Sequence, residues 1–340
     1  MQSPEEFLAL QNIFRIKVHT PYPVGPVNAY LIKKRPYTLI DSGPDTDEGR
    51  ETLLSGLEKA GVKPEEIERV IITHNHSDHS GLANWLNRIS GAQIFVHRLE
   101  VRKMQNEYIY YQENLPFLHE AGLPQYELNN IINDIDPVPR PVLPNQGVTL
   151  LSGGELLEYA DMKLRIHHLP GHCGGHICLH DEENHIFFAG DLILKHITPN
   201  PLMEAIEPDL KERLPVLSQY INSVNIFGGL SVKIALPGHG SFIQGNRDVA
   251  ARAVRHHQDR LEHYLAVMDG KEYSVYELMR VLYPRVKGFQ IYLALSEVNA
   301  HLDYLFSRGT LNSQEKQGVF YYSTLPDSSG CSFDVIQNNT

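Results

Sequence analysis

The sequence predicts an α/β protein, and three observations lead to this prediction. Between residues 37 and 239, short β-branched runs alternate with stretches of helical spacing. Most of these runs end in Gly, Pro, Asp or His, as strands that lead into turns do. The 340 residues are 42% hydrophobic and 21% charged, which is typical of a folded globular chain and too long for one small module.

The first two thirds of the chain supply the sheet and its covering helices. Apolar residues recur three and four positions apart over 53–60 and 82–89, so we expect two helices that cover a sheet. The predicted strands are 37–41, 69–74, 93–97, 164–168, 177–180, 185–189 and 232–236.

Residues 98 to about 150 interrupt this alternation and predict an inserted helical segment. Apolar and aromatic residues, Tyr108 and Tyr111 among them, recur at helical steps with no strand between them. The segment ends in a proline-rich run that can continue neither a helix nor a central strand. The two tyrosines are candidates for contact with an apolar group of a ligand, and packing of the insert onto the sheet explains them equally well.

After about residue 250 the pattern changes again. One long amphipathic helix is followed by two more, near 275–283 and 290–307, and then by a strand-like stretch at 319–322. This is the element order of a winged-helix-like module. We therefore expect a main domain over 1–250, a winged-helix-like domain over 251–325 and a disordered tail over 326–340.

Charge and cysteine content narrow the class of protein. Thirty Lys and Arg against forty-one Asp and Glu give a net charge of -11, and residues 251–340 carry nearly equal numbers of acidic and basic side chains. A nucleic-acid partner is therefore not expected. Three cysteines are too few for a disulfide framework, and we find no export signal and no apolar run of membrane length. We expect a cytoplasmic protein with no membrane contact.

Four potential metal ligands, His74, His76, Asp78 and His79, fall at the end of one predicted strand. Residues two apart at a strand end point the same way, so His74 and His76 can converge on one ion. Asp78 and His79 lie where the next helix begins and can face a second ion. Imidazole nitrogen and carboxylate oxygen are ligands that suit zinc. A histidine-rich surface loop is the alternative explanation.

Three further strands also run into a residue that can bind metal. His172 lies in a glycine-rich turn, Asp191 follows the strand at 185–189, and His239 follows the strand at 232–236. We expect the four strand ends to form one pocket, because they repeat the same arrangement.

Three neighbouring residues need separate interpretation. His176 is expected to be a buried, hydrogen-bonded histidine, and Cys173 a small residue in a tight turn. His196, five residues after Asp191, is expected at the mouth of the pocket as a candidate for substrate contact.

With these motifs, the sequence resembles the metallo-β-lactamase superfamily over about residues 12–250. The His-x-His-x-Asp-His motif is intact, and the later His, Asp and His motifs follow in the expected order. The resemblance implies an αββα sandwich, with the helical insert and the winged-helix-like domain added to it. It also implies that Asp41, in the family's first motif, orients a ligand histidine. It assigns His74, His76 and His172 to one metal ion, Asp78, His79 and His239 to a second, and Asp191 as the bridge.

The resemblance further implies a hydrolase with two zinc ions per chain, iron or manganese being the alternative metals. A metal-bridged hydroxide would attack the acyl carbon of a small thioester or ester, with Asp78 and Asp191 as catalytic residues. Asp78 would orient the water and carry its proton. The Pro-Gly-His-Cys-Gly-Gly-His segment, the insert and the C-terminal module look most like the glyoxalase-II-like branch.

Other functions stay open at this point. Some relatives with such a module act on RNA, so a metal-dependent endoribonuclease or phosphodiesterase is the second hypothesis. An iron-dependent persulfide dioxygenase shares much of the motif. A winged-helix nucleic-acid-binding regulatory protein is the third hypothesis, and the module's near-neutral charge disfavours it. The module's apolar residues are numerous enough to pack on the main domain or on a second subunit, so a homodimer is a further expectation.

Overall fold

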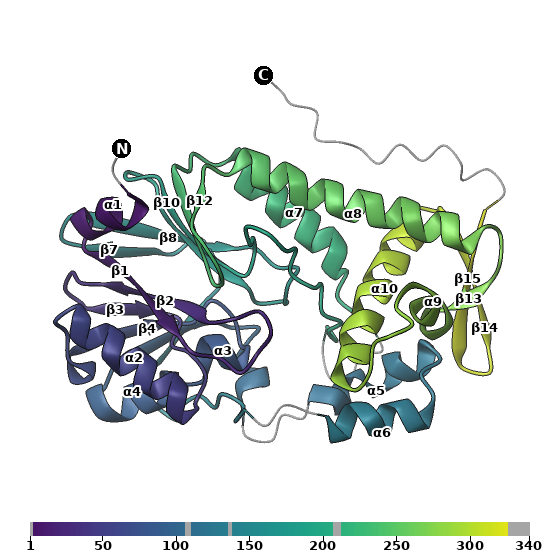
Figure 1. Cartoon of the computed structure of the whole chain (residues 1–340), viewed down its shortest axis with the longest axis horizontal. Helices are drawn as coiled ribbons and strands as arrows, with labels where there is room; N and C mark the ends of the chain where they lie inside the picture. The colour runs from purple at the N-terminus through teal and green to yellow at the C-terminus, as the bar shows by residue number, and fades with distance from the viewer. Residues whose placement is uncertain (1–2, 106–109, 135–137, 207–211, 326–340) are drawn as a thin grey trace.

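The computed structural model describes residues 3–105, 110–134, 138–206 and 212–325 (Figure 1). Two six-stranded sheets pack face to face, and helices cover their outer faces. A second lobe of helices with a three-stranded sheet lies beside this sandwich. The predicted α/β class and the αββα sandwich are confirmed.

The first sheet has the strand order β1-β2-β3-β4-β5-β6. Pairing is antiparallel up to β3 and parallel from β3 to β6, so β3, β4 and β5 end at the same edge. Leu53, Leu57 and Leu86 pack helices α2 (Asp47–Lys59) and α4 (Ala83–Ser90) on its outer face. The strands are β1 (Ile13–Val18), β2 (Val27–Ile32), β3 (Thr38–Ile40), β4 (Arg69–Ile71), β5 (Gln93–His97) and β6 (Val148–Leu151).

The second sheet has the strand order β12-β11-β10-β9-β8-β7, and only β10 and β11 pair in parallel. Its inner face packs on the first sheet through residues such as Phe188 and Leu236, which meet Ile40 and Ile71, and helix α1 (Pro4–Leu10) adds Leu8. Helices α7 (Val216–Gly229) and α8 (Arg247–Met268) cover its outer face. The strands are β7 (Leu156–Tyr159), β8 (Met162–His168), β9 (Ile177–Asp181), β10 (Ile186–Gly190), β11 (Ile234–Pro237) and β12 (Ile243–Gln244).

The second lobe combines the insert with the C-terminal module in one apolar core. Phe117 and Leu128 from the insert pack in the same cluster as Leu261, Leu278 and Leu295. Residues 117–131 of the insert therefore join the C-terminal module, whereas Val101 and Met104 pack on the first sheet, which is the packing that the sequence suggested. The elements are α5 (Tyr110–Glu120), α6 (Gln125–Asn133), the second half of α8, β13 (Tyr273–Ser274), α9 (Val275–Leu282), α10 (Phe289–Ser307), β14 (Leu311–Lys316) and β15 (Val319–Thr324).

The part of the lobe that follows residue 250 has three helices and a hairpin, which is the predicted order with β13 added. Its winged-helix class stays a prediction. The expected boundary at residue 250 falls inside α8, and the expected tail over 326–340 lies outside the described residues. Among the described residues, no helix combines the length and the apolar character needed to cross a bilayer.

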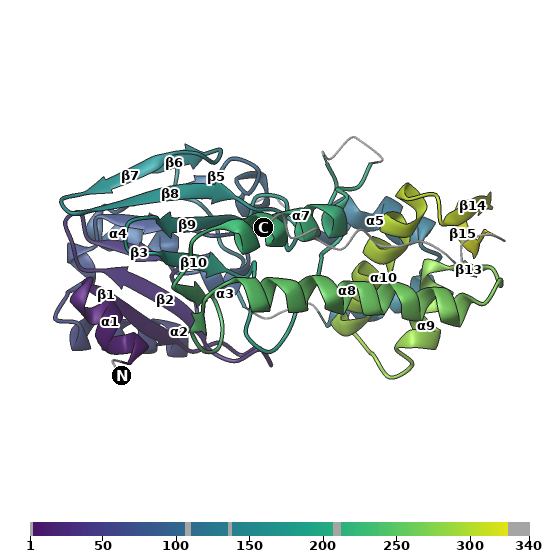
Figure 2. The same cartoon turned by 90° about the horizontal axis from the view of Figure 1, so that it is seen from above.

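Truncation after residue 250 is expected to give an aggregating protein. Helix α8 runs from the sandwich into the lobe (Figure 2), with Val254 in the outer core of the second sheet and Leu261 in the lobe core. Its loss would expose both cores to water. Size-exclusion chromatography with light scattering measures the outcome, with a chain that ends at residue 325 as the control. A monodisperse, folded truncated chain would contradict the shared core.

Candidate metal centre

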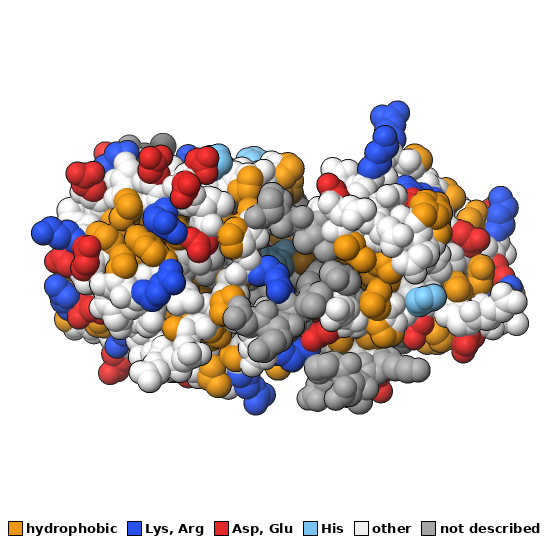
Figure 3. All heavy atoms as spheres, turned by 90° about the horizontal axis from the view of Figure 1, so that it is seen from below, with side chains coloured by type: hydrophobic (Ala, Val, Ile, Leu, Met, Phe, Trp, Pro, Cys, Tyr) orange, Lys and Arg blue, Asp and Glu red, His pale blue; other side chains and the backbone are white. Residues whose placement is uncertain are grey.

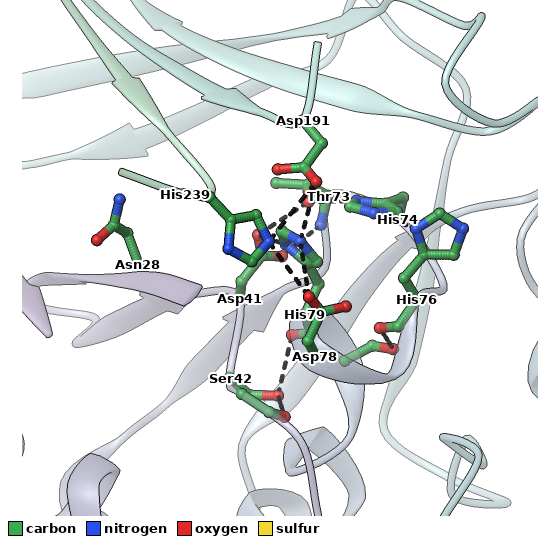
Figure 4. Close-up of polar contacts among 12 residues, drawn as sticks. Asn28, Asp41, Ser42, Thr73, His74, His76, Asp78, His79, Asp191 and His239 are labelled. Carbon is green, nitrogen blue, oxygen red and sulfur yellow. Dashed lines mark hydrogen bonds and ion pairs between the residues drawn. The ribbon is translucent and has the colours of Figure 1, made fainter. Parts of the chain in front are cut away.

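Seven candidate ligands come together where strands of both sheets end, and all of them except His172 are labelled in Figure 4. The segment that follows β4 carries His74 and His76 and continues into the short helix α3 (Ser77–Ser80). His172 follows β8, Asp191 follows β10 directly, and His239 follows β11. Parallel pairing of β10 with β11 brings Asp191 and His239 to the same edge.

One group consists of three histidines. His74 Nε2 lies 2.8 Å from His76 Nδ1, and His172 Nε2 lies 3.1 Å from the same His76 atom. Burial is the main cause that lowers the pKa of each of these imidazoles, and the neighbouring histidines lower it further for His74 and His76. The three rings are therefore neutral, and neutral imidazole is the form that binds a metal ion.

The second group consists of Asp78, His79 and His239. Asp78 Oδ2 lies 3.2 Å from His239 Nε2 and 3.9 Å from His79 Nε2. Asp191 lies between the two groups. Its Oδ2 atom is 3.5 Å from His79 Nε2, 3.7 Å from His239 Nε2 and 3.9 Å from His172 Nε2.

Two buried atoms in this cluster have no hydrogen-bond partner among the described residues. They are His79 Nε2 and Asp191 Oδ1. A buried polar atom without a partner costs about 1–3 kcal/mol, so a further partner is expected at this point. Nitrogen and oxygen donors at this spacing suit divalent metal ions. The residues present therefore fit the metal ions that the motifs imply.

In four of the histidines a hydrogen bond holds Nδ1, the ring nitrogen that points away from the cluster. Nε2 of each of these rings therefore faces the cluster. Thr73 Oγ1 donates to Asp41 and is free to accept from His74 Nδ1, at 3.0 Å. His79 Nδ1 donates to Asp41 Oδ2 at 2.8 Å. His172 Nδ1 donates to the backbone carbonyl of Asn200 at 3.0 Å. His239 Nδ1 donates to the backbone carbonyl of Pro26 at 3.2 Å. Such partners fix the tautomer and the orientation of a ligand ring.

Asp41 lies beside His79 and Thr73 (Figure 4). Besides His79, its carboxylate accepts bonds from the Thr73 amide and hydroxyl at 2.8 and 2.9 Å. It is 2% exposed and has a φ of 57°, in the left-handed region that few non-glycine residues adopt. The surrounding hydrogen bonds stabilise this backbone conformation and fix the position of the carboxylate.

Asp41→Asn is expected to weaken metal binding by roughly 10- to 100-fold, because an amide cannot accept all three of these bonds. Competition with a chromophoric chelator measures the affinity of the purified protein. Asp161→Asn, at an exposed ion pair with Lys34, is the matched control. Unchanged affinity in Asp41→Asn would show that Asp41 does not orient His79.

A buried ionic cluster supports the same loops, and it was not predicted from the sequence. Glu100, which is fully buried, accepts from the Asn75 amide at 3.0 Å and from the Gly175 amide at 2.7 Å. Lys103 donates to Glu100 at 2.8 Å and to Glu204 at 2.9 Å. The spacing of Glu100 and Lys103, three residues apart, was the one available sign of an ion pair.

His176 is buried and accepts a hydrogen bond from the Asp191 amide at 3.0 Å, and burial lowers its pKa to about 3. His196 lies exposed in the segment after Asp191, with no hydrogen bond or ion pair to another described residue. Tyr108 and the side chain of Tyr111 lie outside the described residues. The structure thus brings the seven candidate ligands and Asp41 together, and it does not bring His196 into contact with them.

An αββα sandwich with a histidine and aspartate cluster at the edge of its sheets is suited to metal-dependent hydrolysis. The chain belongs to the metallo-beta-lactamase superfamily, whose family model matches residues 22–239. The hydrolase class and the divalent-metal requirement that the resemblance implied are thereby supported.

Similar proteins extend this likeness beyond the sandwich. A probable metallo-hydrolase of Bacillus subtilis is 27% identical over 94% of this chain and 99% of its own length. The crystal structure of a metallo-beta-lactamase family protein from Thermus thermophilus matches with a TM-score of 0.76 and 26% identity, over 92% of this chain and 99% of that chain. An acyl-coenzyme A thioesterase of Gallus gallus is 29% identical over 42% of this chain and 46% of its own length.

Proposed function

We propose that the protein is a binuclear zinc hydrolase that cleaves a thioester or an ester of a small acyl compound. The position of Asp191 is the observation that carries this proposal. Its Oδ2 atom lies 3.5 Å from His79 Nε2 in one ligand group and 3.9 Å from His172 Nε2 in the other. A carboxylate placed in this way can serve two ions at once, and nitrogen-rich donor sets of this kind suit zinc.

The metal ions, when bound, supply Lewis-acid polarisation and a water-derived nucleophile near neutral pH. The chain's own residues supply the orientation. Asp78 is buried beside His79 and His239; burial raises the pKa of its carboxyl group, and the two imidazoles outweigh this effect and lower the pKa. Asp78 is therefore a carboxylate at neutral pH and can accept a hydrogen bond from the attacking water.

Covalent catalysis is not supported for either of the two cysteines that the structure describes. Cys173 and Cys178 are buried, and burial raises the pKa of both thiols well above the usual range. The thiolate is the nucleophilic form of cysteine, so both residues are inert at neutral pH. This agrees with hydrolysis by water.

An acyl substrate is favoured over a nucleic acid on two grounds. The similar protein of Gallus gallus is an acyl-coenzyme A thioesterase, and its likeness to this chain supports the same substrate class here. Acidic and basic side chains are interspersed over the face shown in Figure 3, as the near-neutral charge of the C-terminal module predicts. Phosphate backbones require a basic surface.

Release of free thiol from acyl-coenzyme A and glutathione thioesters tests this proposal, with lactones, phosphodiesters and short RNA as competing substrates. We expect the highest kcat/KM on a thioester or ester. Asp78→Asn, which keeps the side-chain volume and removes the carboxylate charge, is the matched inactive variant. Cleavage of RNA or a phosphodiester with a higher kcat/KM would replace the proposal with the nuclease hypothesis.

A further inference from the structure

The loop that carries His172 is supported from the second lobe. His172 Nδ1 donates to the backbone carbonyl of Asn200 at 3.0 Å, and this bond turns His172 Nε2 toward His76. The side chain of Asn200 points elsewhere, since its Nδ2 atom donates to the carbonyl of Leu293 in α10 at 2.9 Å. One residue thus joins a candidate metal ligand to a helix of the lobe.

The same segment is anchored to α10 a second time. Tyr292, 1% exposed in the lobe core, donates from its hydroxyl to the carbonyl of Met203 at 3.0 Å. Leu202, Met203 and Ala205 are themselves part of the lobe's apolar cluster. The backbone from 200 to 205 is therefore positioned by the lobe, although it belongs to the connection that follows β10.

The segment also reaches the His172 loop from its other side. Glu204 Oε2 accepts from the Gly174 amide at 3.0 Å, and Glu204 Oε1 accepts from Lys103. Lys103 in turn holds Glu100, which bonds the amides of Gly175 and Asn75. Gly174 and Gly175 follow His172, and Asn75 lies between His74 and His76, so this network joins both histidine loops of the first ligand group.

We propose that the second lobe positions the metal ligand His172, with Asn200 and Glu204 as the positioning residues that connect helix α10 to the metal centre. Such a partner fixes the orientation of a ligand and so determines metal affinity. The lobe then contributes to metal binding without touching the ion. This inference depends on the metal-binding role of His172 and is independent of which substrate is cleaved.

Three single variants test the connection. Asn200→Ala keeps the backbone carbonyl that His172 uses and removes only the bond to Leu293, and Tyr292→Phe removes only the phenolic hydroxyl that holds Met203. Tyr264→Phe is the matched control. Tyr264 is also a 1% exposed lobe tyrosine, and its hydroxyl pairs at 3.0 Å with Tyr283, not with the 200–205 segment.

Zinc affinity of each metal-free variant is measured by competition with a chromophoric chelator, and ligand geometry by the visible absorption of the cobalt(II)-loaded protein. Asn200→Ala and Tyr292→Phe are expected to lose roughly 10-fold in affinity for one of the two ions and to shift the cobalt spectrum. Tyr264→Phe should change neither property. Thermal unfolding of the metal-free variants reports the purely structural cost of each substitution.

Two results would overturn the proposal. Asn200→Ala and Tyr292→Phe with parental zinc affinity and an unchanged cobalt spectrum would show that the lobe does not act on the metal centre. Equal loss of affinity in Tyr264→Phe would show that any damage to the lobe weakens the site. Failure of the substrate assay would leave these measurements unaffected, so the two proposals are tested separately.

Discussion

Asp191→Ala is expected to lower kcat/KM by roughly 10³-fold or more, which corresponds to about 4 kcal/mol of transition-state stabilisation. Asp191 is the residue whose carboxylate faces candidate ligands of both groups, at 3.5 to 3.9 Å. Its loss removes a donor from each ion and leaves His79 without its 3.5 Å ion-pair partner. Steady-state kinetics on the preferred thioester or ester, together with metal analysis of the same sample, measure the effect.

The matched comparison for Asp191→Ala is Asp181→Ala, which removes a buried carboxylate of the same sheet. Asp181 lies in β9 and bonds Asn184 at 2.7 and 3.1 Å, away from the candidate ligands. We expect Asp181→Ala to lose activity only to the extent that it unfolds. Activity within about tenfold of the parent in Asp191→Ala, or about 1.4 kcal/mol, would make the bridging assignment wrong.

Removal of metal is expected to abolish hydrolysis and to lower the thermal unfolding midpoint. The purified protein should hold close to two divalent ions per chain, because the structure offers two ligand groups with Asp191 within 3.9 Å of a histidine in each. Ions that bind only the folded chain stabilise it by mass action, so dialysis against a chelator destabilises the fold. Elemental analysis, differential scanning calorimetry and the substrate assay measure content, stability and activity on one preparation.

Readdition of zinc controls for damage during dialysis and should restore both activity and the unfolding midpoint. Iron and manganese readdition then compares the metals that the sequence left open. A metal-free protein with undiminished turnover would make the metal-dependent mechanism wrong. Recovery of activity with one equivalent of zinc per chain would contradict the two-ion proposal and retain the hydrolase class.

The candidate ligands could be predicted because their residue types and their positions directly after strands are local features of the sequence. His74, His76, Asp78 and His79 follow one strand within a few residues, and His172, Asp191 and His239 each follow a strand of their own. A strand end in a sandwich leads to the sheet edge, so the residue type and its place after a strand were sufficient to predict a common pocket. The α/β class followed from the same alternation of strands and helices.

The N-terminal hairpin of β1 and β2 and the outer helix α7 were not predicted. Strand β2 is buried throughout, and β1 has partly exposed and buried positions without a regular alternation that marks a strand. Helix α7 has an apolar stripe at helical spacing, with Leu217, Tyr220, Val224 and Phe227 buried, the last three against the second sheet and α8, so its local pattern could have been found in the sequence. For β1 and β2, tertiary burial, and not local periodicity, determined the sequence pattern.

The sequence by itself determined the superfamily fold, the seven candidate ligands and the place of Asp41 in a motif. Only the tertiary structure decided that the insert and the C-terminal module share one core, and that Glu100, Asn200 and Glu204 hold the histidine loops. The reason is physical. A ligand motif depends on neighbours along one strand, whereas these contacts join residues such as Glu100 with Gly175 and Asn200 with Leu293, which are 75 and 93 positions apart. The first contact forms only when two loops of the sandwich meet, and the second only when the 200–205 segment packs on the lobe, so no local pattern encodes them.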